Sequence, residues 1–182
     1  MSDAAISPRL SADAWLDAGL QALCLDGPTV LRAEVLARRL GVTKGSFYWH
    51  FADVGAFHDA LLARWSQAVL ALAEELATAS QTETAHLRNL CQMVAGGGKD
   101  NPWQAIRAWA QSHPKASQTV AQVDARILQQ VERLLSGLGI GNPEMARIVY
   151  AAAIGLAGMD DVDPVQNAQA AGTLIDLVLA LR

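Results

Sequence analysis

The stretch of residues 36–51 restricts the fold of this chain more than any other part of the sequence. Leu36 and Leu40 lie at helical spacing and mark one buried helix face. Gly41 follows at once, at the position where many helices end in the left-handed conformation. Thr43 can then cap a second helix by accepting a backbone N–H with its hydroxyl. We therefore predict two short helices joined by a tight turn.

The second helix of this pair presents hydrogen-bond donors and flat rings on a short surface. Phe47 and Phe51 are its apolar anchors. Lys44 can reach a phosphate or guanine, and Tyr48 can reach a base methyl group or a phosphate. Two alternatives stay open, namely Lys44 as a solvated lysine and Trp49 packed at the junction with the next helix. A polar helix held by a preceding helix has the form of a helix-turn-helix DNA reader. The residues predicted to contact DNA are Arg32, Thr43, Lys44, Gly45, Ser46, Tyr48, Trp49 and His50.

The rest of the chain predicts an all-α fold, because no stretch sustains an alternation of apolar and polar residues. A first helix is expected over residues 11–25 and a long fourth helix over 53–78. Later helices have clear starts, in which a capping residue precedes a proline at the first helical position. These starts are Asn101-Pro102, His113-Pro114, Asn142-Pro143 and Asp163-Pro164. Nine helices result, divided into a domain over 1–52 and a helical body over 53–182, with the fourth helix as connector.

Charge and composition limit the classes of function. The net charge is -4 over 182 residues, yet the stretch 28–51 is basic and contains Glu34 as its only carboxylate. The chain begins without an export signal, and its longest apolar stretch, 145–159, is too short to span a bilayer. We therefore expect a cytoplasmic protein with no membrane partner. The sequence shows no catalytic or metal-ligand spacing, so we expect no enzyme activity, no cofactor and no metal site.

The segment Gly41-Val-Thr-Lys-Gly-Ser-Phe-Tyr-Trp-His-Phe51, followed by Phe57 and Leu61, closely resembles the DNA-binding head of the TetR family of bacterial transcription regulators. The resemblance implies a homodimer that binds an inverted-repeat operator in double-stranded DNA and acts as a ligand-responsive repressor. Family members commonly carry Lys or Arg four residues after the histidine of the motif, where this chain has Val54. That departure leaves an alternative, a regulator-like protein that binds a small molecule or a partner and has weakened DNA binding.

The resemblance also implies where an effector and a second subunit would bind. Helices four to seven would surround a ligand cavity. An apolar cavity with Arg107 as its charged group would suit a hydrophobic or weakly acidic effector, although each lining residue could equally belong to a closed core. The last two helices are apolar on more than one face, so they need a cover from a second subunit or from the body itself. The predicted pocket residues are Trp65, Val69, Leu90, Met93, Trp103, Arg107, Val123 and Ile127. The predicted interface residues are Ala152, Gly155, Leu156, Leu174, Leu177, Val178 and Leu181.

Overall fold

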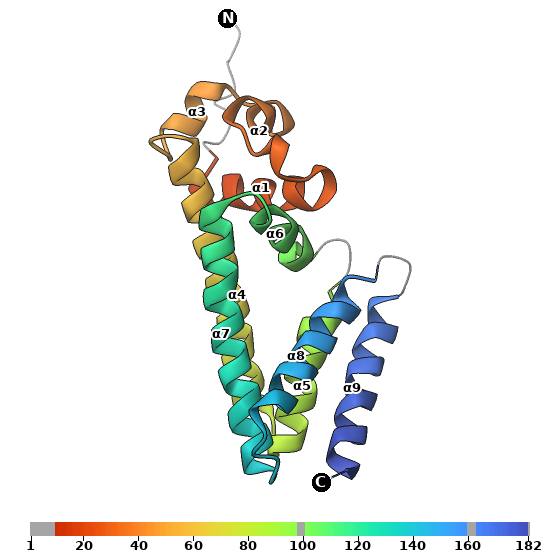
Figure 1. Ribbon diagram of the computed structural model, residues 1–182. Helices are drawn as coiled ribbons and strands as arrows, with labels where there is room; N and C mark the ends of the chain where they lie inside the picture. The colour runs from red at the N-terminus through yellow and green to blue at the C-terminus, as the bar shows by residue number, and fades with distance from the viewer. Residues whose placement is uncertain (1–9, 98–100, 160–162, 182) are drawn as a thin grey trace, which may run out of the picture.

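The computed structural model describes residues 10–97, 101–159 and 163–181. Within these ranges the chain is helical and contains no strand, which confirms the predicted all-α fold (Figure 1). The helices are α1 Ala12–Asp26, the 3-10 turn η1 Pro28–Val30, α2 Ala33–Arg39, α3 Lys44–Tyr48, α4 Val54–Ala79, α5 Glu83–Ala95, α6 Pro102–Ala110, α7 Pro114–Gly137, α8 Pro143–Ala157 and α9 Pro164–Ala180.

Local capping chemistry fixes most helix starts, as the sequence predicts. The Ser11 hydroxyl accepts the Ala14 N–H at 3.2 Å, and ring nitrogen Nδ1 of His113 accepts the Ala116 N–H at 3.2 Å. Each of the four Pro-started helices has a side chain at its N-cap position that accepts a backbone N–H. These bonds satisfy amides that the first helical turn leaves without partners.

Thr43 departs from this pattern, and the predicted cap by its hydroxyl is wrong. Thr43 occupies the N-cap position of α3, but its side chain makes no capping hydrogen bond. The backbone explains the difference, because the Ser46 N–H already donates to the Thr43 carbonyl oxygen at 3.0 Å. The amide that the hydroxyl would have accepted is therefore taken.

The helices form an elongated molecule with the first three helices gathered at one end (Figure 1). We call α1, α2 and α3 the head. The long helices α4 and α7 run side by side from the head along the length of the molecule, and α6 packs against α1 beneath the head. At the opposite end α5 packs against α8 and α9.

An aromatic cluster holds the head together. The ring of Phe47 is fully buried, and its centroid lies 5.3 Å from that of Trp15, 5.2 Å from that of Phe51 and 5.3 Å from that of Phe57. Phe57 belongs to α4, and a methyl group on Gly19 of α1 would come within 2.6 Å of its ring. The first turns of α4 therefore complete the core of the head, so the hydrophobic core continues across the predicted domain boundary after residue 52.

Candidate nucleic-acid interface

The turn between α2 and α3 sets the position of the candidate reading helix. Gly41 has a φ of 66°, the left-handed value for which glycine is favoured, as predicted. The Val42 N–H then donates to the Ala37 carbonyl oxygen at 3.0 Å, which closes the turn against α2. Because α3 has only 5 residues, it is too short to be stable alone, and this turn and the buried Phe47 determine where it lies.

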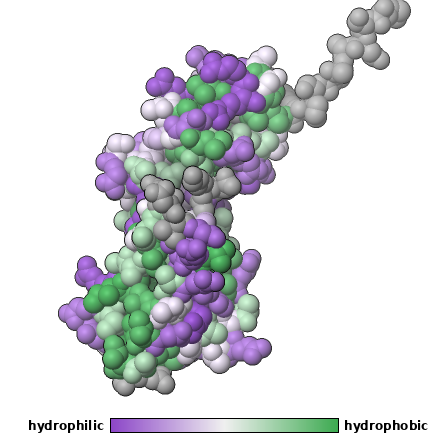
Figure 2. All heavy atoms as spheres, turned by 90° about the vertical axis from the view of Figure 1, so that its right-hand side faces the viewer, coloured by the Kyte–Doolittle hydropathy of each residue, from purple (hydrophilic) through white to green (hydrophobic). Residues whose placement is uncertain are grey.

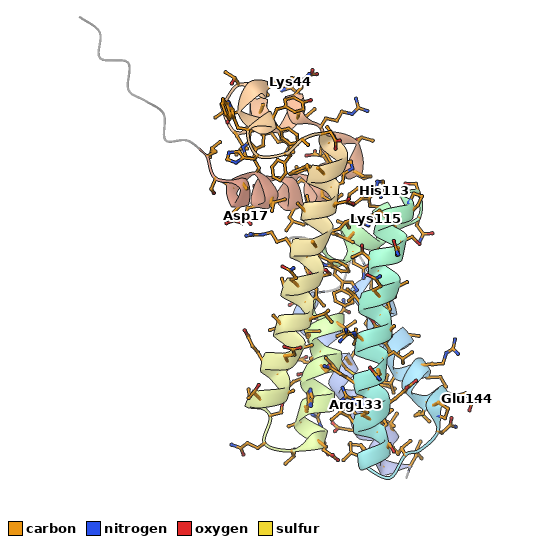
Figure 3. All side chains as sticks on the ribbon, turned by 90° about the vertical axis from the view of Figure 1, so that its left-hand side faces the viewer. Asp17, Lys44, His113, Lys115, Arg133 and Glu144 are labelled. Carbon is orange, nitrogen blue, oxygen red and sulfur yellow. The ribbon has the colours of Figure 1, made fainter. Side chains whose placement is uncertain are left out.

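Six of the eight residues predicted to contact DNA are exposed, and α3 lies at the outer end of the head. Tyr48 is 47% exposed and Trp49 is 75% exposed, which favours a contact surface over packing at the α4 junction. Figure 3 shows Lys44 at this outer end, far from Arg133 and Glu144 of the body. The remaining predicted residues are exposed in the case of Arg32, Thr43 and Gly45, and half-buried in the case of Ser46 and His50.

The structure corrects the predicted role of His50. Its ring nitrogen Nε2 is buried and has no hydrogen-bond partner within the described ranges, and its ring centroid lies 6.3 Å from that of Phe51. One edge of the imidazole therefore faces the interior of the head. Of the two ring nitrogens, Nδ1 is therefore the one that remains for the predicted contact with a phosphate.

Two ion pairs join helices on the surface of the head. The Lys44 ammonium donates a hydrogen bond to the Glu34 carboxylate, and the Arg39 guanidinium donates to Asp26. The bond from Lys44 is the main cause of a lowered pKa of Glu34, and the same bond raises the pKa of Lys44. In the sequence, Glu34 is only one carboxylate within a basic stretch. The pairing depends on how α2 and α3 meet in space, so the sequence carried no signal for it.

The first turn of α4 carries its own carboxylate cap, which opposes the binding of an anion there. Asp53 caps this helix, and its carboxylate oxygen Oδ1 accepts the Ala56 N–H at 2.7 Å. The carboxylate occupies the helix terminus where a phosphate would otherwise be attracted. Because the next residue is Val54, this terminus has no cationic side chain that could pair with a DNA phosphate.

Two polar side chains of α4, Arg64 and His58, attach this helix to the head in addition to the aromatic cluster. The Arg64 guanidinium donates to Asp13 at 2.7 Å and to Asp17 at 2.6 Å, which lie one turn apart on α1. Ring nitrogen Nε2 of His58 lies 3.0 Å from the carbonyl oxygen of Leu31. These contacts couple the N-terminal half of α4 to α1 and to the segment just before α2.

The predicted pocket residues do not line one cavity. Five of them, Trp65, Leu90, Trp103, Val123 and Ile127, are buried in the core, and Val69 is partly buried against it. The rings of Trp65 and Trp103, whose centroids are 5.7 Å apart, fill the space between α4 and α6. Met93 instead lines a surface groove of about 520 Å³ between α4, α5 and α9, and Arg107 lines one of about 380 Å³ between α6 and α7.

Arg107 is held in a polar network rather than standing alone in an apolar cavity. Its guanidinium donates two hydrogen bonds to Asp124, at 2.7 and 2.9 Å, and the Tyr150 hydroxyl donates to the same carboxylate at 2.8 Å. This network joins α6, α7 and α8. Burial is the main cause of the raised pKa of Tyr150, so its hydroxyl remains a donor at neutral pH.

The last two helices expose an apolar face over part of their surface. Figure 2, which views the molecule from the side of α9, shows hydrophobic side chains gathered on its lower part. Leu177 and Leu181 are exposed, as an interface residue requires, but Val178 is buried within its own chain and cannot contribute much to a contact surface. Ile148 of α8 is 58% exposed and was missed, because the sequence does not give the rotation of α8 about its axis. Ala152, Leu156 and Leu174 are half-buried, and Gly155 is exposed.

Membrane-spanning helices and metal sites are both absent from the part of the chain that the structure describes. No helix there is long and apolar enough to cross a membrane. Within the same ranges, no group of 3 or more His, Cys, Asp and Glu side chains is placed so that it could hold a metal ion.

Comparison with known proteins gives the fold its context. The sequence matches no family model and no curated protein. A protein from Rhodococcus sp. named as a TetR-family transcriptional regulator superposes with a TM-score of 0.77 and 20% identity, covering 92% of this chain and 98% of its own. A transcriptional regulator from Rhodococcus sp. Rha1 superposes with a TM-score of 0.78 and 17% identity, covering 94% of this chain and 97% of its own. A regulator from Saccharomonospora viridis in complex with choline superposes with a TM-score of 0.76 and 14% identity, covering 91% of this chain and 95% of its own. The chain therefore has the fold of the TetR-family transcriptional regulators.

Proposed function

We propose that this protein is a DNA-binding transcriptional regulator, most simply a ligand-responsive repressor, that binds an inverted-repeat operator as a homodimer. The observation that carries the proposal is the exposed surface of α3, where Lys44, Tyr48 and Trp49 project from a helix anchored by the buried Phe47. Large exposed aromatic side chains next to an exposed cation suit a surface that contacts bases and phosphates. The shared fold with transcriptional regulators supports the same reading.

Dimerisation is a physical requirement of this function. One short helix reads only a few base pairs, and each base pair contributes roughly 1–3 kcal/mol of discrimination. Two heads related by a twofold axis double the number of base pairs read and favour an inverted repeat. The apolar face of α8 and α9, with Ile148, Leu177 and Leu181 exposed, supports pairing through these helices. Leu177→Arg should give monomers in sedimentation velocity, whereas Leu25→Arg at an exposed position of the head should leave the dimer intact.

An effector site within the α4–α7 region is the third part of the proposal. The indole N–H groups of Trp65 and Trp103 are buried and have no acceptor among the residues that the structure describes, which is unusual for buried donors. A hydrophobic effector that carries a hydrogen-bond acceptor and inserts between these rings would satisfy both donors. The choline in the S. viridis regulator shows that a protein of this fold can hold a small molecule. Quenching of tryptophan fluorescence by candidate effectors, lost in Trp103→Phe, tests the site.

DNA binding itself is tested with duplexes selected by the protein from a random pool. Tight, salt-dependent binding to an inverted repeat is expected in fluorescence anisotropy. Lys44→Ala should weaken binding and reduce the salt slope by about 1 for each head, and Tyr48→Ala should weaken it without unfolding the protein. Arg126→Ala, which removes an exposed cation of α7, is the matched control and should bind as wild type does. Absence of binding to any duplex at low salt would refute the proposal.

A second candidate is a regulator-like protein whose head binds DNA weakly. The observation that favours it is the start of α4, where the carboxylate of Asp53 occupies the helix terminus and Val54 provides no cation. Substituting Val54→Lys separates the two candidates. If the wild type already binds an inverted repeat and Val54→Lys raises its DNA affinity only modestly, the first candidate is supported. If only Val54→Lys binds DNA, the second candidate is supported.

A further inference from the structure

We propose that Glu34 acts as an internal substitute for a DNA phosphate, which holds Lys44 in an ion pair and thereby limits the affinity of the head for DNA. This inference rests on the proposed function, because it concerns the same reading surface. It assigns a role in DNA binding to a residue that does not itself attract DNA.

The ion pair lies on the exposed surface of α2 and α3, at the start of the reading helix. Glu34 lies in the first turn of α2, and Lys44 is the first residue of α3. The Lys44 ammonium donates its hydrogen bond to carboxylate oxygen Oε1 of Glu34 across the turn between these helices. The side chains are 49% and 72% exposed, so both remain accessible to an approaching duplex. Arg32, at the N-cap of α2, adds a further attraction on Glu34.

Both groups keep their charges at neutral pH. The hydrogen bond with Lys44 lowers the pKa of Glu34, and that same bond raises the pKa of Lys44. The carboxylate is therefore present wherever DNA binding would take place. Lys44 is the only cation in α3, all of whose residues the structure describes, so the reading helix has no second cation to replace it.

A phosphate that approaches Lys44 meets two obstacles. It must displace the carboxylate from the ammonium, and the released carboxylate then repels the DNA backbone beside it. Both costs are independent of base sequence, so Glu34 weakens binding to operator and to unrelated DNA by similar factors. Since both charges are exposed, salt screens the pair, and its effect on affinity should diminish as the ionic strength rises.

Glu34→Gln tests the inference, because glutamine keeps the shape of the side chain and removes its charge. We expect this variant to bind both the selected operator and a scrambled duplex roughly three- to tenfold more tightly at 50 mM salt, as expected for releasing one exposed ion pair in each of two heads. The ratio of the wild-type Kd to the variant Kd should fall towards one as salt is raised to about 300 mM. Anisotropy titrations of full-length protein measure both quantities.

Two further variants show whether Glu34 acts through Lys44. Asp26→Asn removes a carboxylate from the other ion pair of the head and changes the net charge equally, so it controls for general attraction to DNA. Glu34→Gln should also lose most of its effect in a Lys44→Ala background. An equal gain from Asp26→Asn, a full gain without Lys44, or weaker operator binding by Glu34→Gln would each overturn the inference. A wild type that binds no DNA would instead refute the proposed function.

Discussion

Replacing Phe47 by alanine should separate the anchor of the reading helix from its DNA-contacting residues. The Phe47 side chain is fully buried, and its ring is surrounded by the rings of Trp15, Tyr48, Phe51 and Phe57 at centroid distances between 5.2 and 5.3 Å. Truncating a buried phenylalanine costs about 3–5 kcal/mol, and this site should lie at the upper end because edge-to-face ring contacts are lost as well. Such a loss is a large share of the roughly 5–15 kcal/mol that stabilises a whole domain.

Urea unfolding followed by far-UV circular dichroism measures this cost, and a thermal scan should show a midpoint lowered by roughly 6–20 °C. Trp49→Ala is the matched control, since this neighbouring ring is 75% exposed and its removal should change stability by less than about 1 kcal/mol. The two variants should both lose DNA affinity, but only Phe47→Ala should lose stability. A loss below about 1 kcal/mol in Phe47→Ala would refute the view that the aromatic cluster holds α3 in place.

Three other predictions concern single residues. Gly41→Val should destabilise the protein by about 1–2 kcal/mol in urea unfolding, because Gly41 has a φ of 66°, whereas Gly141→Val, at a glycine with no close neighbour and no positive φ, should cost less. Burial raises the pKa of Cys91 to about 12, so its thiol should react with a disulfide reagent only as fast as the body opens, as shown by a rate that matches hydrogen exchange in α5. Burial is also the main cause of the lowered pKa of His58, so the folded state binds a proton less readily than the unfolded state. The unfolding free energy should therefore hold above pH 7 and fall as pH drops through 6.5, by less than about 1.4 kcal/mol per pH unit, with a smaller fall in His58→Gln.

Features set by neighbouring residues were predictable from the sequence. The Pro-started helices α6 to α9 begin where a cap residue precedes proline, because one side-chain bond and one fixed φ are enough to define a helix start. The turn at Gly41 likewise needs only the local backbone. The exception at Thr43 is also local, since in so short a helix the backbone carbonyl takes the amide that a hydroxyl would cap.

Features set by helix rotation and by contacts between helices were not predictable. Leu177 is exposed and Val178 is buried, although the two are adjacent and equally apolar, because successive helical residues point about 100° apart. Periodicity in a helix that is apolar on more than one face does not show which face turns inward, and Ile148 was missed for the same reason. The pocket prediction met a similar limit, because only packing shows that Trp65 and Trp103 fill the interior themselves.

The helix α4 connects the head with the body, because its residues contribute to the cores of both. Its 26 residues span roughly 39 Å, and its first turns contribute Phe57 and Leu61 to the core of the head. Trp65, two turns beyond Phe57, faces Trp103 of α6 in the body. A ligand that separates these two rings would push on α4 and α6, and both helices contact α1. Gly19 of α1 packs closely against Phe57 and Leu61, so a shift of α4 towards α1 would displace α1 as well. We therefore expect an effector bound between the tryptophans to alter the position of the head without touching α3.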